Sequence, residues 1–216
     1  MIRQMEPRST GSRPSTAQAF TRVVQGWHTD QKGRLAMLRR NAGEPLAEAR
    51  GITWMYVLLN DFGRGLDGQG RGYDDETLFL TATLLAFDRK YLEGRPKPPL
   101  MGSFGRTMAA MKRQPGANAE SIERRFAILL DADFLPRTGE GELPFRLRQT
   151  VKLVLSKDVG IDWPRLLNDL SAWNNADKPV QKRWAKEFYA PYAELSEEQS
   201  VEEQSVEEEN GEANAD

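Results

Sequence analysis

Apolar residues recur with the spacing of an α-helix through most of this chain, and the alternating pattern of a β-strand is almost absent. Residues 15–27 give the first clear case. Ser15 and Gln18 have the spacing of a capping box. Apolar side chains then follow at i, i+3, i+4 and i+7, from Phe20 to Trp27. This pattern predicts a helix that buries one face against the rest of the protein.

The same periodicity predicts about eight or nine helices with short connections, which is the organisation of a compact all-α bundle. Asp30, Asp74 or Asp75, Asp162 and Asp177 are the expected N-caps of four of these helices. Gly and Pro residues mark where most of the helices end. The predicted helices cover residues 15–30, 31–41, 45–63, 75–92, 103–114, 119–133, 144–160, 163–173 and 178–189.

Charge is distributed unevenly along the chain. The whole sequence has a net charge of −2, yet residues 194–216 contain ten acidic residues and no basic residue. Residues 1–193 therefore hold all 30 basic residues and 22 acidic ones, a net charge of +8. We predict a disordered polar segment over residues 1–14, a helical domain over residues 15–193 and a disordered acidic tail over residues 194–216. A basic domain favours an anionic partner.

Composition disfavours several classes of protein. The sequence contains no cysteine, so a disulfide framework, a cysteine nucleophile and a cysteine metal site are excluded. The N-terminal residues lack the apolar segment of a secretory signal peptide. The longest apolar run, residues 52–59, is too short to span a bilayer. These features agree with a cytoplasmic protein that is not bound to a membrane.

Candidate catalytic and cofactor motifs are weak. The glycine-rich segment 63–72 begins with GRGLDG, which matches G-x-G-x-x-G, but neither the strand before nor the helix directly after that a dinucleotide site needs is predicted. The four acidic residues between 67 and 76 lack the spacing of a calcium-binding loop. His28 is the only histidine, and no cysteine is present to join it in a metal site. We therefore predict a surface loop, no catalytic residue, no metal and no cofactor.

Basic side chains form a stripe on the predicted helix over residues 31–41. At about 100° per residue, Lys32, Arg39 and Arg40 fall within one sector of the helix. Leu35 and Leu38 lie on the opposite side. The helix dipole favours Arg39 and Arg40 at the C-terminal end but disfavours Lys32 in the first turn. Helix-end stabilisation therefore does not explain the whole stripe.

Two later helices carry similar basic pairs. Arg124 and Arg125 lie in the N-terminal half of the helix over residues 119–133, where the helix dipole gives them no support. Arg148 and Lys152 are four residues apart on another helix, and such a like-charge pair mildly destabilises an isolated helix. Its presence is explained if an anion binds there.

Two interpretations of these seven cations remain open. They can be solvated residues that pair with acidic neighbours such as Glu123 or Asp131. Alternatively, in a domain of net charge +8, they form a surface that binds nucleic-acid phosphates, and we favour this for the set as a whole. The sequence shows no zinc finger, aromatic RNA-binding pattern or convincing helix-turn-helix, so such binding is expected to be independent of base sequence.

An ordered series of motifs extends this interpretation. MLRRNAG is followed by RRFAILLDAD, FRLRQTVKLV, IDWPRLLNDLSAW and VQKRWAKEFY. In order and spacing, over about residues 15–192, these motifs resemble the CasB family, the small subunit of the type I-E CRISPR surveillance complex called Cascade. The glycine-rich segment and the acidic tail look like additions to the family pattern.

The resemblance implies an all-helical, non-enzymatic protein that works within Cascade. Two small subunits of this family lie head to tail along the complex, where they contact its crRNA-bound backbone subunits and the large subunit. They help to hold the target strand and the displaced strand of the R-loop, and a separate nuclease–helicase cuts the target. The expected partners are therefore crRNA, target DNA, the other Cascade subunits and a second copy of this chain.

The resemblance also assigns roles to particular residues. It carries the basic role to Arg39, Arg40, Arg125, Arg148 and Lys152, and helical-wheel geometry adds Lys32 and Arg124. The large apolar residues Trp163, Leu167, Trp173 and Trp184 are assigned to the core or to subunit packing. The alternative, from another functional class, is a helical protein-interaction scaffold whose basic face binds an acidic protein partner. A third possibility, an enzyme, is disfavoured because His28 has no partner of defined type.

Overall fold

The computed structural model describes residues 15–64, 72–99, 101–135 and 137–190, which form ten α-helices, one 3₁₀-helix and no β-strand. The all-α class expected from the sequence is confirmed, with slightly more helices than the eight or nine predicted. The segments expected to be disordered, 1–14 and 194–216, and most of the glycine-rich segment lie outside the described residues. The elements are α1 (Thr16–Asp30), α2 (Lys32–Arg40), η1 (Leu46–Glu48), α3 (Met55–Phe62), α4 (Asp75–Leu85), α5 (Arg89–Leu92), α6 (Phe104–Lys112), α7 (Ala119–Asp131), α8 (Leu143–Ser156), α9 (Trp163–Ser171) and α10 (Pro179–Tyr189).

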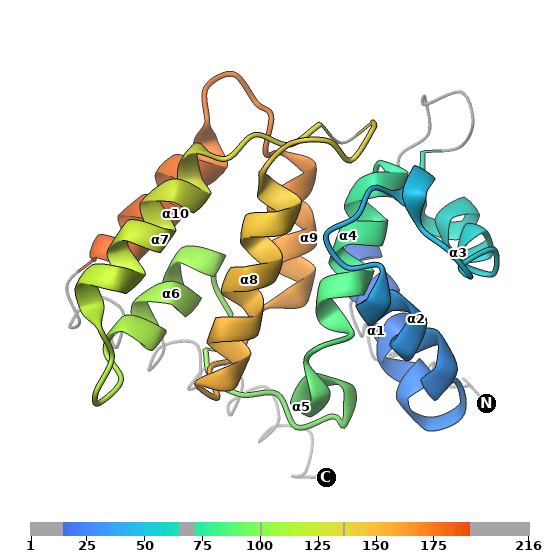
Figure 1. The fold of residues 1–216 in the computed structure, drawn as a ribbon, viewed down its shortest axis with the longest axis horizontal. Coiled ribbons are helices and arrows are strands. Elements are labelled where there is room, and N and C mark those ends of the chain that lie inside the picture. The colour runs from blue at the N-terminus through green and yellow to red at the C-terminus, as the bar shows by residue number, and fades with distance from the viewer. Residues whose placement is uncertain (1–14, 65–71, 100, 136, 191–216) are drawn as a thin grey trace, which may run out of the picture.

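The helices form two groups on either side of a central pair. Figure 1 shows α1 to α5 on the right, α6, α7 and α10 on the left, and α8 and α9 between them. Both α1 and α4 pack against α9, and α2 packs against α1 and α4. On the other side, α6 packs against α10 and α7, and α7 also contacts α8. The helix α4 therefore lies in the interior, with α2 and α8 on two of its sides.

The sequence of α4 explains its central position. Every residue from Glu76 to Leu85 is buried, as expected for a helix that is apolar all round. Two of its three threonines are accommodated because their hydroxyls bond within the helix. The Thr81 hydroxyl donates to the carbonyl of Thr77 at 2.8 Å, and the Thr83 hydroxyl donates to the carbonyl of Leu80 at 2.8 Å. Neighbouring helices can thus pack on several faces of α4 at once.

Three tryptophans anchor the core around α9 and α10, as predicted. Trp163, Trp173 and Trp184 are fully buried, and each indole N–H has an acceptor. Trp163 donates to Asp88 Oδ2 at 2.9 Å, Trp173 to the carbonyl of Ala132 at 2.9 Å, and Trp184 to Asp169 Oδ2 at 2.6 Å. The core thereby includes buried carboxylates that the apolar pattern did not reveal.

Two predicted helices are divided in the structure. The predicted helix over residues 75–92 is split into α4 and α5 at Asp88. The buried Asp88 carboxylate accepts from Trp163 and, at 3.0 Å, from the Tyr91 N–H, so it caps α5. The predicted helix over residues 45–63 is split into η1 and α3, with Gly51 at φ 72° between them. A left-handed residue cannot continue a right-handed helix.

Two predicted caps are wrong. The N–H of Gln31 still bonds to the carbonyl of Trp27 at 3.0 Å, so α1 continues through Asp30 instead of ending before it. Asp177 lies in the turn before α10, where its N–H donates to Asn175 Oδ1 at 3.0 Å. The N-cap position belongs to Lys178, with φ 48°. The capping box of Ser15 and Gln18 and the caps at Asp74 and Asp162 lie where the sequence predicted.

Candidate nucleic-acid interface

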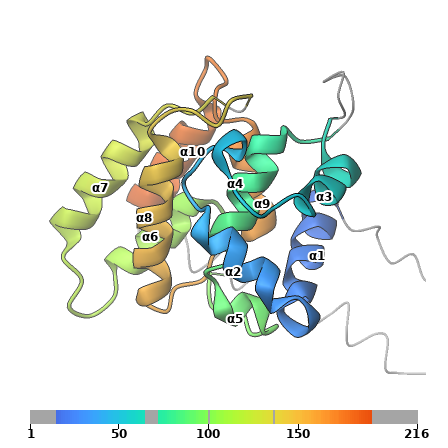
Figure 2. The same ribbon diagram turned by 45° about the vertical axis from the view of Figure 1, so that its right-hand side comes forward.

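Two of the predicted cations meet at the C-terminal end of α4. Arg39 extends from the last turn of α2, and its Nη1 donates to the carbonyl of Ala86 at 3.0 Å. Lys152 extends from α8, and its Nζ lies 5.6 Å from the centre of the Phe87 ring. Ala86 and Phe87 are consecutive, so the end of α4 brings together residues that are far apart in the sequence. Figure 2 shows α8 to the left of α4 and α2, with α5 below them.

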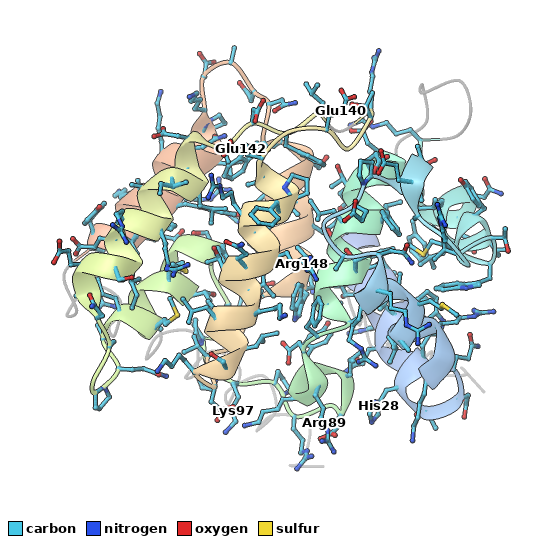
Figure 3. The ribbon with its side chains drawn as sticks, in the orientation of Figure 1. His28, Arg89, Lys97, Glu140, Glu142 and Arg148 are labelled. Carbon is cyan, nitrogen blue, oxygen red and sulfur yellow. The ribbon has the colours of Figure 1, made fainter. Side chains whose placement is uncertain are left out.

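Arg148 adds a third cation to the same side of α8, one turn before Lys152. It packs beside Gly43, the residue at φ 88° that follows α2, where an added Cβ would lie 3.2 Å from Arg148 Cδ. Within the described part of the chain, the Nε of Arg148 is buried and has no hydrogen-bond partner. In Figure 3, Arg148 lies between α8 and α4. The Arg148 side chain is only half-buried, so its positive charge still contributes to this side of the protein even though its Nε lies inside.

The other two predicted cations of α2 lie on its exposed side. Lys32 and Arg40 are exposed, whereas Leu35 and Leu38 are buried, so the helical-wheel prediction is correct for the inward face. The nearby acid Asp88 faces Trp163 in the core, and burial raises the pKa of its carboxyl. We call the set formed by Lys32, Arg39, Arg40, Arg148 and Lys152 the α2–α8 basic surface.

Arg124 and Arg125 form a separate group on α7. Both side chains are exposed. Arg125 lines a hollow of about 250 Å³, together with Leu153 of α8 and Lys157 just after it. Because α8 lies between α7 and α4 (Figure 1), this pair lies on the other side of α8 from the end of α4. The structure thus brings five of the seven predicted residues onto α2 and α8 and places two on α7.

Ion pairing distinguishes these seven residues from several other basic residues. Arg146 forms an ion pair with Glu142 at 3.0 Å, and Lys112 forms one with Glu123 at 3.2 Å. By contrast, none of the seven predicted cations forms an ion pair with an acidic side chain in the ranges that the structure describes. Pairing with Glu123 or Asp131, which the sequence left open, is therefore not seen for Arg124 or Arg125.

Four basic residues near α5 were not singled out from the sequence. They are Arg89, Lys90, Arg95 and Lys97. Figure 3 shows Arg89 and Lys97 at the edge of the molecule, below Arg148. The sequence holds these residues as DRK at the start of α5 and RPK just after it. The first lay within a predicted helix, and the prolines around the second indicated only a connection.

The weaker motifs gain no support as catalytic or cofactor sites. A helix, α3, precedes Gly63, so the strand that a dinucleotide site needs is absent at this point. The Glu76 carboxylate accepts from the N–H of Leu46 with both oxygens, at 3.0 and 2.9 Å. His28 lies in the last turn of α1.

Over residues 15–64, 72–99, 101–135 and 137–190, no group of three or more His, Asp or Glu side chains could hold a metal ion. No helix in those ranges is long and apolar enough to cross a bilayer.

Comparison with known proteins agrees with this architecture. The family model for the CRISPR-associated protein Cse2 matches residues 34–189. The Cse2 protein of Thermus thermophilus is 41% identical over 176 residues, covering 82% of this chain and 88% of that protein. The crystal structure of M. ruber CasB has a TM-score of 0.62 at 31% identity, covering 88% of this chain and 99% of the other. A structure of a CRISPR RNA-guided surveillance complex contains a chain with the same fold, at a TM-score of 0.66 and 20% identity, over 85% of this chain and 97% of that chain.

The fold and the basic surface define an all-α helical protein with a cationic face made by α2 and α8. The chain belongs to the Cse2 family of CRISPR-associated proteins, also called CasB. The family resemblance expected from the ordered motifs is thereby confirmed.

Proposed function

We propose that this protein is the non-catalytic small subunit of a type I-E Cascade complex. In this role it binds the backbone of single-stranded nucleic acid without reading sequence, and it stabilises the R-loop formed by crRNA and target DNA. Its partners are the target and displaced strands, the crRNA-bound backbone subunits, the large subunit and a second copy of itself placed head to tail. The role is a part of antiviral defence.

The observation that carries this proposal is the position of cations around the end of α4 that form no ion pair with an acidic side chain among the described residues. Arg39 and Lys152 lie against consecutive residues, Ala86 and Phe87, and Arg148 follows one turn away. Like charges held together without acidic partners repel each other, and an anion removes that repulsion. Arg and Lys side chains bind phosphate oxygens by charge-assisted hydrogen bonds. The surface has the chemistry of a phosphate-binding site and offers no base-reading motif.

The energetics of R-loop formation make such contacts sufficient. Exchange of a DNA duplex for an RNA–DNA duplex is nearly balanced, so modest protein contacts to the backbone of the strands can shift the equilibrium. Membership of the Cse2 family supports this role, as does the likeness in fold to a chain of a CRISPR RNA-guided surveillance complex.

The proposal is tested by reconstitution of Cascade with its other subunits and crRNA, with and without this protein. R-loop stability is then measured as the fraction of open target that survives an added competitor strand. We expect the wild-type protein to stabilise the R-loop and the double variant Arg39→Ala/Lys152→Ala to do so less. The variant Lys182→Ala/Lys186→Ala removes the same charge from exposed positions on α10 and should behave as wild type.

Two results would contradict the proposal. If the complex holds its R-loop equally well without this protein, the subunit does not stabilise the open strands. If the Arg39/Lys152 variant assembles and behaves as wild type, the α2–α8 basic surface is not the binding surface. Loss of assembly in that variant, with single-strand binding intact, would instead favour a scaffold whose basic face meets an acidic protein.

A further inference from the structure

A second concentration of positive charge lies around α5, in the connection between α4 and α6. Lys90, Arg95, Pro96 and Lys97 line a surface hollow of about 330 Å³ there. The side chains of Lys90, Lys97 and Arg95 are 45%, 43% and 75% exposed, so part of each cation faces solvent. The walls of this hollow, which we call the α5 hollow, are therefore almost entirely basic.

Two carboxylates beside the α5 hollow are each shared between two cations. Asp158 pairs with Lys90 through Oδ1 and with Lys97 through Oδ2, the latter at 3.1 Å. Glu93 pairs with Arg89 through Oε1 at 2.5 Å and with Arg95 through Oε2. Among these six side chains the four cations exceed the two carboxylates by a charge of +2, and the Asp88 carboxyl that caps α5 is buried beneath them. Hydrogen bonds from Lys90 and Lys97 lower the pKa of the Asp158 carboxyl, and those from Arg89 and Arg95 lower the pKa of Glu93.

The ion pairs also hold the cations in place while leaving them able to bind. An ammonium has three N–H donors and a guanidinium has five. Lys90 and Lys97 can therefore keep their bonds to Asp158 and still donate to a further oxyanion. A preordered cation loses less conformational entropy on binding than a free one.

The backbone under the α5 hollow is held by close packing. The N–H of Gly160 donates to the carbonyl of Pro98 at 2.9 Å. An added Cβ on Gly160 would lie only 1.5 Å from the carbonyl oxygen of Lys97, so this approach is possible only with glycine. The segment that carries Asp158 is thus docked directly against the segment that carries Lys97.

The α5 hollow continues the α2–α8 basic surface. Arg39 and Lys152 contact Ala86 and Phe87, and α5 begins at Arg89. Figure 3 shows Arg148 between α8 and α4, with Arg89 and Lys97 at the edge of the molecule below it. A strand lying along the α2–α8 basic surface would reach α5 without crossing the apolar core.

We propose that the α5 hollow is a phosphate-binding subsite for single-stranded nucleic acid, adjoining the α2–α8 basic surface. This inference rests on the proposed function, because the subsite extends the same bound strand. Lys90 and Lys97 each act as a point charge toward a phosphate of the strand, and the planar guanidinium of Arg95 binds a phosphate at the edge of the hollow. Asp158 and Glu93 position these cations.

The test uses the full chain and a fluorescently labelled oligothymidylate, with affinity measured by anisotropy over a range of salt concentrations. The double variant Lys90→Ala/Lys97→Ala should lose two phosphate contacts. We expect its log–log salt slope to fall by about 1.4, at about 0.7 per contact on a single strand. Lys182→Ala/Lys186→Ala on α10 carries the same charge change and should keep the wild-type slope.

A second variant is expected to change the affinity for the oligonucleotide in the opposite direction. Asp158→Asn removes the carboxylate shared by Lys90 and Lys97 and raises the excess charge of the hollow from +2 to +3, so it should bind the oligonucleotide more tightly than wild type. A purely structural role for Asp158 predicts no tightening. Circular dichroism on each variant verifies that it is folded.

The outcomes separate this inference from the proposed function. If Lys90→Ala/Lys97→Ala matches the α10 control while Arg39→Ala/Lys152→Ala still weakens binding, the subsite is overturned and the function stands. If both variants bind as wild type, the proposed function fails as well. If polyglutamate binds the α5 hollow and the oligonucleotide of matched charge does not, the hollow binds an acidic peptide and the inference is wrong.

Discussion

Arg39 of α2 and Lys152 of α8 lie against consecutive residues at the C-terminal end of α4. Arg39 donates to the carbonyl of Ala86 at 3.0 Å, and the Lys152 ammonium lies 5.6 Å from the ring of Phe87. The last carbonyls of a helix have no partner within it, so Arg39 satisfies one of them and is held in place by doing so. Its other N–H donors, and those of Lys152, remain for an anion. One residue thus serves both helix stability and the charge of the surface.

Arg39→Ala and Lys152→Ala should therefore differ in stability but not in binding. Loss of the hydrogen bond to Ala86 is expected to lower the free energy of unfolding by about 1 kcal/mol, a fall in Tm of about 2–4 °C. Lys152→Ala should change Tm less, because its side chain is exposed and has no hydrogen bond to lose within the described chain. Both variants should weaken binding to single-stranded DNA. Equal Tm values for the two variants, measured by calorimetry, would argue against the capping role.

Arg148 and Arg146 provide a matched pair on one helix. Arg146 pairs with Glu142 at 3.0 Å, whereas the Nε of Arg148 has no partner among the described residues. We expect Arg148→Ala to reduce the salt slope of single-strand binding by about 0.7, and to do so equally for oligonucleotides of different sequence. Arg146→Ala should leave the slope near the wild-type value. A larger loss for Arg146 than for Arg148 would place the binding face elsewhere on α8.

Gly105 should be required for the packing of α6 on α10. An added Cβ there would lie 2.1 Å from the carbonyl oxygen of Trp184, which is backbone and cannot rotate away. Gly105→Ala should lower the free energy of unfolding by about 1–3 kcal/mol, measured by urea denaturation. Gly26→Ala is the control, since Gly26 lies within α1 and has no atom within 4 Å of an added Cβ. This control should be neutral or up to about 1 kcal/mol stabilising.

Glu76 should give stability a distinct pH dependence. Burial raises the pKa of its carboxyl, Asp75 raises it further, and the hydrogen bond from Leu46 only partly offsets these effects. The folded protein therefore holds this proton at pH values where the unfolded chain, with a Glu pKa of about 4.3, has lost it. The contribution is fully present below about pH 4.3 and is lost as the pH rises through the folded pKa.

Urea denaturation at a series of pH values, followed by tryptophan fluorescence, measures this contribution. Glu76→Gln keeps an acceptor for the Leu46 N–H but cannot titrate. The stability of wild type relative to Glu76→Gln should therefore fall as the pH rises above about 4.3. Parallel pH profiles for the two proteins would show that the Glu76 carboxyl has the same pKa in both states.

The acidic tail should oppose nucleic-acid binding through its charge alone. Residues 194–216 carry ten acidic and no basic residues, and they repel a phosphate backbone. Deletion of these residues should tighten binding to single-stranded DNA at low salt. The gain should shrink at high salt, because the screening length falls from about 10 Å at 0.1 M to about 3 Å at 1 M. A tail of equal length with Gln and Asn in place of the acids should bind like the deletion. Identical low-salt affinities for the full chain and the deletion would contradict this expectation.

The periodic pattern of apolar residues was enough to predict the all-α class and most of the helices. Leu35, Leu38 and Phe20 are buried as their spacing predicted, because a 3.6-residue period places such residues on one face of any helix. The caps at Ser15 and Asp162 were also predictable, since a cap bonds to an N–H within the next three residues. These features depend only on neighbours in the sequence.

The two long helices that were predicted in one piece are divided where a distant residue bonds to the local structure. The predicted helix over residues 75–92 breaks at Asp88 because the indole of Trp163 bonds to its carboxylate. Leu46 begins a 3₁₀ turn instead of a long helix, and Glu76 accepts its N–H. Helical periodicity contains no information about such contacts.

The sequence by itself determined that the protein is helical, that its domain is basic and that its motifs follow the order of the Cse2 family. The tertiary structure decided how the cations are grouped in space. It placed Arg39 beside Lys152, separated both from Arg125, and added Lys90 and Lys97, which sequence reasoning had missed. The physical reason is that periodicity specifies the face of a helix on which a charge lies, whereas the local field depends on distances between charges on different helices, and these distances exist only once the core has packed.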